Sequence, residues 1–208
     1  MKRGIDKTIF LIRHGQTDYN LKGIVQGSRV DADLNDTGFK QAEKFFQKYK
    51  DVPFDKIYTS KLKRTIQTVQ KFIDKGISWE SYEGLNEISW GDQDGVAVNS
   101  SMHEYYQYVS KEWASGNLSL QIGGGESPLE VLERQKPVIK LILEERPDEK
   151  TILVCMHGRA IRILLCYLTN KSLCEMDSFE HSNLCLYKLH YDGEEIKVLS
   201  VNDIDHLR

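Results

Sequence analysis

The sequence has little net charge and no long apolar run, and each of these shortages excludes a class of protein. The formal net charge of the 208 residues is −3, which gives no electrostatic case for binding DNA, RNA or an anionic membrane surface. No segment reaches the roughly 18 apolar residues of a membrane span. The apolar run 8–12 is also too short for a signal peptide. We therefore expect a cytoplasmic protein that binds neither nucleic acid nor membrane.

Cysteines are few, and their spacing lacks the Cys-x-x-Cys pattern of many zinc and redox sites. The four are Cys155, Cys166, Cys174 and Cys185. Two of them, Cys155 and Cys185, lie in apolar, strand-like runs. This favours buried free thiols in a reducing compartment over a disulfide or a zinc site.

The composition is that of a folded globular protein, with 40% hydrophobic and 28% charged residues. The length suits one domain, with or without a subdomain insert. Short apolar runs predict buried strands at 8–12, 54–59 and 151–156. Apolar residues at helical spacing predict helices over 35–50, 99–115, 128–145 and 159–168. A further helix follows 54–59: Ser60 can cap it, and Leu62, Ile66, Val69 and Ile73 form its apolar stripe.

Strands alternate with helices, which predicts an α/β fold with a mostly parallel sheet and helices on both faces. Two C-terminal runs, 184–190 and 196–201, are joined by the turn sequence Tyr191-Asp-Gly-Glu194. This hairpin signal adds an antiparallel edge strand. We expect a three-layer α/β/α sandwich.

Two of the predicted strands end in His-Gly. The run 8–12 leads into Arg13-His14-Gly15, and the run 151–156 leads into His157-Gly158-Arg159. In an open parallel sheet, ligands bind beyond the carboxyl ends of the strands. The two imidazoles can therefore face each other if the two strands are neighbours. The glycine after each histidine permits a sharp turn and a close approach of a ligand to the backbone.

Each of three further residues has an ordinary structural explanation when it is considered by itself. Arg13 could form a salt bridge at the rim of the sheet, Arg64 could be an exposed helix cation, and Glu87 could be any surface acid. Together with the two histidines, they suit phosphoryl transfer without a metal or another cofactor. Two guanidiniums can hold a phosphate, one imidazole can attack phosphorus, and the other can donate to a phosphoryl oxygen. A carboxyl group can protonate the leaving oxygen and then activate water.

At this point the sequence resembles the histidine phosphatase superfamily, also called phosphoglycerate-mutase-like. Leu11-Ile-Arg-His-Gly-Gln-Thr-Asp-Tyr-Asn20 is similar to the opening motif of the family. The similarity continues in the family's order nearly to the C-terminus. It includes Gln26-Gly27, Leu34-Asn-Asp-Thr-Gly38, Ser60 to Thr68, Leu85-Asn-Glu87, Gly124-Gly-Glu-Ser127, Met156-His-Gly158 and Asn202-Asp203.

The resemblance implies a role for each of five residues. His14 is the nucleophile and becomes phosphohistidine. Arg13, Arg64 and His157 form the phosphate pocket. Glu87 is the general acid and then the general base, as in the branch that takes its acid from this middle loop.

The resemblance also implies a wider substrate site and a domain plan. Asn20 and the backbone N–H of Gly158 contact the phosphate, while Thr17, Gln26 and Gly27 line the site. Residues 1–208 form one histidine phosphatase domain, in which about 88–133 is a helical insert that caps the active site.

Three features differ from the usual family pattern. The stretch 26–31 is one residue longer than usual and Asp33 replaces a common proline, 91–95 lacks the usual Trp-Glu pair, and Arg159 follows Gly158. Arg159 could add positive potential near the site or face water. The roles of Arg29 and Arg159 stay open.

The charge of the insert favours hydrolysis over phosphoglycerate mutation. Between residues 88 and 133, Lys111 is the only lysine or arginine. The same stretch contains Asp92, Asp94, Glu104, Glu112, Glu126, Glu130 and Glu133. A negative insert is a poor clamp for a bisphosphate intermediate. We therefore predict a phosphomonoester hydrolase that acts on a small phosphorylated metabolite, with a phosphoglycerate mutase as the alternative.

Two hypotheses place the same residues in different classes of protein. A binding or regulatory module with an inactive site would keep the phosphate pocket without turnover. A metal hydrolase with His14 and His157 as ligands is disfavoured, because the flanking arginines would repel a cation.

The aromatic residues of the insert either pack a helix or form an apolar wall for a leaving group. Those on its predicted helix are Tyr105, Tyr106, Tyr108 and Trp113. They do not identify the substrate, which stays open together with the pH optimum and the oligomeric state, including a homodimer.

Overall fold

The structure, a computed structural model, describes residues 5–208 and is built on one six-stranded sheet with the strand order β3-β2-β4-β1-β5-β6. Strands β3, β2, β4 and β1 run parallel, whereas β5 runs antiparallel to both β1 and β6. The strands are β1 (Lys7–Arg13), β2 (Lys56–Thr59), β3 (Trp79–Ser81), β4 (Thr151–Met156), β5 (Leu186–Tyr191) and β6 (Ile196–Asp203). The predicted α/β fold, with a mostly parallel sheet and a C-terminal hairpin at one edge, is confirmed.

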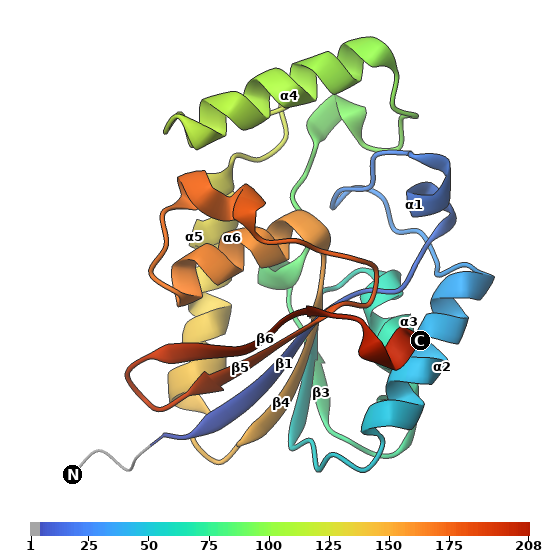
Figure 1. Cartoon of the computed structure of the whole chain (residues 1–208), viewed down its shortest axis with the longest axis vertical. Coiled ribbons are helices and arrows are strands. Elements are labelled where there is room, and N and C mark those ends of the chain that lie inside the picture. Colours follow the sequence, from blue (N-terminus) through green and yellow to red (C-terminus); the bar gives the residue numbers. More distant parts are fainter. Residues whose placement is uncertain (1–4) are drawn as a thin grey trace.

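Helices cover both faces of the sheet, which gives three layers (Figure 1). Phe10 and Ile12 of β1 pack in the cluster formed with α2 (Asp36–Tyr49) and α3 (Lys63–Asp74). Ile9 and Leu11 point to the opposite face and pack with α5 (Pro128–Lys140) and α6 (Gly158–Leu168). This alternation follows from the two-residue repeat of side chains along a strand.

Most predicted helices lie where the apolar pattern indicates, and α2 begins at the expected cap, where the Asn35 side chain accepts from the N–H of Gly38. The prediction that Ser60 caps α3 is wrong, because Leu62 is the N-cap and the helix begins only at Lys63. The hydroxyl of Ser60 accepts instead from the N–H of Leu62 at 3.1 Å. Six short elements had no clear pattern in the sequence: α1 (Asp18–Lys22), β3, and the 3₁₀ helices η1 (Glu83–Leu85), η2 (Gly91–Gln93), η4 (Leu173–Ser178) and η5 (Asp205–Leu207).

Strands β1 and β4 are neighbours, which is the condition for the two His-Gly motifs to meet. Arg13 pairs with Met156 at the carboxyl end of this parallel ladder. The N–H of His14 continues the ladder by donating to the carbonyl of Met156 at 3.0 Å. His14 and His157 therefore leave the sheet side by side.

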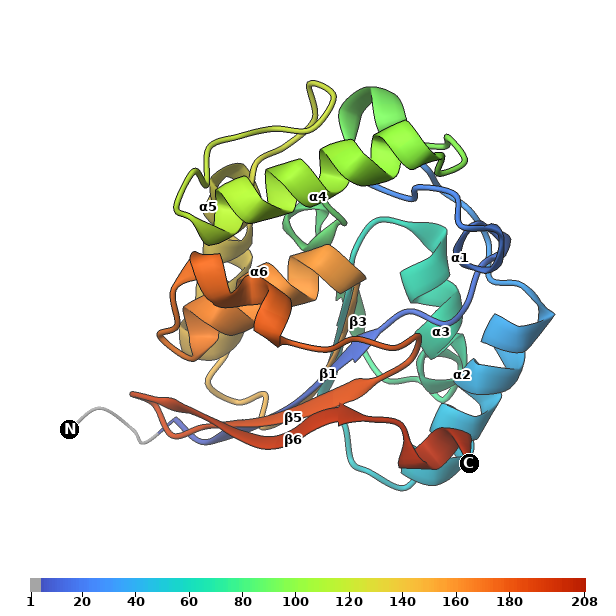
Figure 2. The same ribbon diagram turned by 45° about the horizontal axis from the view of Figure 1, so that its top comes forward.

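Helix α4 (Ser100–Ala114) lies across the end of the molecule toward which the parallel strands point (Figures 1 and 2). It buries Val109 and Trp113 and exposes Tyr105 and Tyr108. The aromatic residues of this segment are therefore divided between packing and solvent. Within residues 5–208, no helix is long and apolar enough to cross a membrane.

Candidate active site

The two strand-end histidines form the centre of the site. The ring centroids of His14 and His157 lie 5.1 Å apart, and both side chains are buried. Burial, reinforced by the charge of Arg64, lowers the pKa of each imidazole well below its usual value. Both rings are therefore neutral at pH 7, and a neutral imidazole has a lone pair that can attack an electrophile.

Hydrogen bonds fix the tautomer of each ring. Nδ1 of His14 donates to the carbonyl of Gly15 at 2.7 Å, which leaves the lone pair on Nε2. Arg64 Nε donates to Nδ1 of His157 at 3.2 Å, so Nε2 of that ring carries the proton. This Nε2–H lies 2.8 Å from the hydroxyl of Ser60. Nε2 of His14 is thus an acceptor, whereas Nε2–H of His157 is a donor that lies against the Ser60 hydroxyl.

Arg64 is fully buried beside the histidines. Its Nη1 donates to the carbonyl of Val30 at 2.6 Å, and its Nη2 donates to the carbonyl of Gly27 at 3.3 Å. Burial lowers the pKa of the guanidinium to about 10, which still leaves it charged at pH 7. A buried cation without a carboxylate in direct contact is costly unless an anion joins it.

Arg13 is the second guanidinium of the site. Its Nη1 donates to Nδ1 of His181 at 3.2 Å. Its Nε is buried and has no hydrogen-bond partner in the part of the chain that the structure describes. Burial and the nearby Arg13 lower the pKa of His181 to about 3, so this third imidazole is also neutral. Its Nε2 lies 3.1 Å from the place that a Cβ on Gly158 would occupy.

Glu87 is held by backbone N–H groups at the beginning of α6. Its Oε1 accepts from the N–H groups of Ile88 and Ala160, each at 2.9 Å. Its Oε2 accepts from the N–H of Arg159 at 3.1 Å. The helix terminus supplies donors and a positive dipole to the carboxylate. Because α6 directly follows His157, these bonds bring Glu87 beside the second histidine.

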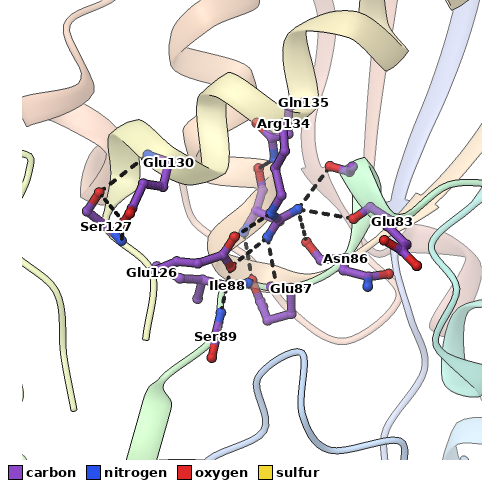
Figure 3. A network of polar contacts seen from close by, with 12 residues as sticks. Glu83, Asn86, Glu87, Ile88, Ser89, Glu126, Ser127, Glu130, Arg134 and Gln135 are labelled. Atoms are coloured by element: carbon purple, nitrogen blue, oxygen red, sulfur yellow. Dashed lines mark hydrogen bonds and ion pairs between the residues drawn. The ribbon is translucent and has the colours of Figure 1, made fainter. Parts of the chain in front are cut away.

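Arg134 of α5 fixes the loop that carries Glu87 (Figure 3). Its guanidinium donates to the carbonyls of Gly84 and Asn86, each at 3.0 Å, and to that of Glu87 at 3.0 Å. It also forms an ion pair with Glu126, whose other oxygen accepts from the N–H of Ser89 at 2.9 Å. One side chain therefore ties three backbone carbonyls of the acid loop to a helix.

The segment after His14 supplies the predicted lining residues. Thr17 caps α1, and its hydroxyl accepts from the N–H of Asn20 at 3.2 Å. The Gln26 amide bridges this hydroxyl, at 2.6 Å, and Arg64, from whose Nη1 its oxygen accepts at 3.2 Å. Asn20 Oδ1 accepts from Asn183 at 3.1 Å, and the same amide of Asn183 donates to the carbonyl of His14.

Gly27 lies where two segments touch. A Cβ at this position would lie 2.5 Å from the carbonyl oxygen of Ile88 and 2.2 Å from Oδ1 of Asp94. Only glycine allows this approach without a shift of the backbone. The contact brings the Gly27 carbonyl, which accepts from Arg64, against the loop of Glu87.

Arg159 neither faces water nor adds free charge to the site. It is buried, its Nη1 donates to Asp177 at 2.7 Å, and its Nη2 donates to the hydroxyl of Tyr106. Its guanidinium also lies 5.4 Å from the ring centroid of Trp113. Arg159 therefore anchors α4 to α6 and η4.

The structure thus brings together all ten residues that the sequence singled out. Four participants were not predicted: Ser60 as a partner of His157, and Arg134, His181 and Asn183. Ser60 belongs to a family motif that also contains Arg64, so the motif itself indicated that Ser60 lies near the site. The others come from a helix or a loop with no periodic or motif signal that indicates contact with the site.

The thiols take no part in this arrangement, and the histidines and acids of the described residues form no cluster that could bind a metal ion. Cys155, Cys166 and Cys185 are buried, Cys174 is half-buried, and all four are free. Among residues 5–208, no three His, Cys, Asp or Glu side chains lie close enough together to hold a metal ion.

With this geometry in view, the chain can be compared with known proteins. A model of the histidine phosphatase superfamily (branch 1) matches residues 9–204. The chain belongs to this superfamily. The family predicted from the sequence is confirmed.

The relatives include phosphatases and a mutase. The putative phosphoserine phosphatase 2 of Hydrogenobacter thermophilus is 29% identical over 97% of this chain and 98% of that protein. The 2,3-bisphosphoglycerate-dependent phosphoglycerate mutase of Bradyrhizobium diazoefficiens is 30% identical over 80% of this chain and 83% of the mutase. The crystal structure of phosphoserine phosphatase from Entamoeba histolytica, in complex with 3-phosphoglyceric acid, superposes with a TM-score of 0.81. It is 27% identical and covers 97% of this chain and 100% of that one.

Proposed function

We propose that this protein hydrolyses a small organic phosphate monoester through a covalent phosphohistidine on His14, with Glu87 as general acid and base and without a metal ion. The observation that carries the proposal is the tautomer of His14. Its Nδ1–H is committed to the carbonyl of Gly15, so the Nε2 lone pair is available beside two guanidiniums. An imidazole in this state is a suitable nucleophile for phosphorus.

In the first step, Nε2 of His14 forms a bond to phosphorus and the ester P–O bond breaks. Arg13 and Arg64 hold the phosphoryl oxygens, and Nε2–H of His157 turns from the Ser60 hydroxyl to donate to one of them. Asn20 and the N–H of Gly158 complete the phosphate contacts, while Thr17, Gln26 and Gly27 line the pocket.

Glu87 transfers the proton in both steps. Its Oε1 accepts two N–H groups and its Oε2 only one, so a lone pair on Oε2 remains for the transferred proton. Glu87 enters the first step protonated on Oε2 and gives this proton to the leaving alkoxide, which leaves as the alcohol. In the second step, Glu87 takes a proton from water, the water oxygen bonds to phosphorus, the P–N bond breaks and inorganic phosphate leaves.

A test of this function compares the wild-type protein with His14→Ala on p-nitrophenyl phosphate. We expect turnover that survives a metal chelator in the wild type and is lost in the variant. Acid quenching of the wild type during turnover should trap phosphate on His14. Turnover that persists in the variant, or a label on another residue, would contradict the proposal.

A phosphoglycerate mutase is the second candidate, because one relative carries that name at 30% identity. Release of inorganic phosphate from 3-phosphoglycerate favours the hydrolase, whereas formation of 2-phosphoglycerate with no phosphate release favours the mutase. Binding of phosphate esters without either reaction would indicate an inactive regulatory module.

We further propose one domain in which residues 88–133 cap the site, in a cytoplasmic protein. Support for the cap comes from α4, which lies across the open end of the sheet, and from its anchor at Arg159. Whether the protein forms a homodimer can be measured by light scattering.

A further inference from the structure

A cavity of about 450 Å³ adjoins the candidate active site. Asn20, Gln26 and His181 belong to both, since each lines the cavity and also contacts a residue of the site. The volume is in the range of small-molecule pockets. If phosphate binds between the arginines, the rest of the substrate extends into this space.

The walls of the cavity come from α1, from the segment after it and from the beginning of α4, which lie near one another in both ribbon views (Figures 1 and 2). Most of these walls are apolar. Their apolar members include Tyr19, Ile24, Trp90, Val98, Met102 and Tyr106. Among the described residues that line the cavity, none is a lysine, arginine, aspartate or glutamate.

The arginines near the cavity either border the proposed phosphate site or already face a carboxylate. Arg13 and Arg64 border the phosphate site, Arg159 and Arg162 both bind Asp177 at 2.7 Å, and the exposed Arg29 lies beside Asp94. His181 is neutral at pH 7, because burial and Arg13 lower its pKa. A carboxylate or a second phosphate moved into such a cavity would lose its hydration without gaining a partner.

We propose that the cavity accepts an uncharged, apolar organic group, so that the preferred substrates are phosphate monoesters of apolar alcohols rather than phosphoserine, phosphoglycerates or bisphosphates. This inference rests on the proposed phosphatase function and specifies its substrate class. An apolar group gains here from the removal of its surface from water. Aromatic groups suit walls that include Tyr19, Trp90 and Tyr106.

The experiment compares kcat/KM for 3-phenylpropyl phosphate, 3-phosphoglycerate and O-phosphoserine, all of which are esters of aliphatic alcohols. We expect 3-phenylpropyl phosphate to exceed both others by at least tenfold. Met102→Lys, which adds a cation to the wall, should reduce this ratio by about tenfold. Tyr108→Lys adds the same charge at an exposed position of the same helix, outside the cavity, and should leave the ratio unchanged.

Equal values for the three substrates, or a preference for either carboxylate, would overturn the inference while leaving the phosphatase intact. If the protein hydrolyses none of them, nor p-nitrophenyl phosphate, the proposed function fails. In that case, the affinity of the wild type for each phosphate ester, measured by calorimetry, tests the inference about the cavity without requiring turnover. Tighter binding of 3-phenylpropyl phosphate than of 3-phosphoglycerate would support it, and equal or weaker binding would overturn it.

Discussion

Oε2 of Glu87 accepts a hydrogen bond from the backbone N–H of Arg159 at 3.1 Å. Because the side chain of Arg159 binds Tyr106 of α4, one residue contacts both the candidate acid and the helix above the site. The position of the carboxylate is thereby coupled to the packing of α4. Substitutions of Glu87 or of Tyr106 should therefore change the activity or the stability of the protein measurably.

Replacement of Glu87 tests its role as proton donor. Glu87→Gln should reduce kcat for 3-phenylpropyl phosphate by at least about 100-fold, because an aliphatic alkoxide needs a proton to leave. The loss for p-nitrophenyl phosphate should be below about tenfold, since its leaving group is weakly basic. Steady-state rates on the two substrates provide the measurement. Equal losses would show that Glu87 does not supply that proton.

Arg134 should act on the reaction only through the loop of Glu87. Arg134→Met removes its bonds to the carbonyls of Gly84, Asn86 and Glu87, and we expect kcat to fall more for an aliphatic phosphate than for p-nitrophenyl phosphate. Loss of hydrogen bonds to a charged group should also lower the free energy of unfolding by about 2–3 kcal/mol. The control is Lys136→Met, at an exposed ion pair of the same helix. A uniform loss on both substrates would argue against a positioning role.

The anchor between Tyr106 and Arg159 should stabilise the protein. Tyr106→Phe removes one hydrogen bond to a buried guanidinium, and we expect the free energy of unfolding to fall by about 1.5–3 kcal/mol in urea titrations. Tyr108→Phe, at an exposed position of the same helix, should change it by less than about 0.5 kcal/mol. If both variants match the wild type, Tyr106 does not anchor α4.

The buried histidines predict how stability depends on pH. The pKa of His14, His157 and His181 is lowered in the folded state, mainly by burial, so the unfolded chain binds these protons first. Stability should therefore fall as the pH drops below about 6.5, the usual histidine value, and should be unaffected by these groups above it.

His181→Asn isolates one of these contributions. Between about pH 6 and pH 4, the free energy of unfolding should fall more steeply in the wild type than in the variant. The difference between the two slopes should be about 1.4 kcal/mol per pH unit. Urea unfolding in phosphate-free buffer measures this slope. His103→Asn, at an exposed histidine, provides the matched control. A slope in His181→Asn equal to that of the wild type would mean that His181 is not buried as a neutral ring.

The sequence predicted the strands and the long helices because their apolar residues repeat with the period of the element that they form. The pairing of His14 with His157 also followed from their place at the ends of two buried strands. What it could not predict is the order of the strands, because β1 and β4 are separated by most of the chain and their pairing depends on the whole core.

The missed contacts share a physical cause. Arg134 and His181 reach the site from an amphipathic helix and an irregular loop, where neither spacing nor composition distinguishes them from surface residues. Ser60 does not cap α3 because the chain is still extended at Leu62, and the Ser60 hydroxyl instead contacts the N–H of Leu62 and Nε2 of His157. From the sequence, Arg159 could either lie near the site or face water, whereas its side chain is buried and binds Tyr106 of α4.

The ladder between β1 and β4 sets the separation of the two imidazoles at the carboxyl end of the sheet, whereas Val98, Met102 and His103 of the cavity wall lie at or just before the beginning of α4. Within residues 5–208, the side chains of these three residues form no hydrogen bond with the residues of the candidate active site. An engineer could redesign residues 98–103 for a new leaving group and keep the same phosphoryl-transfer core.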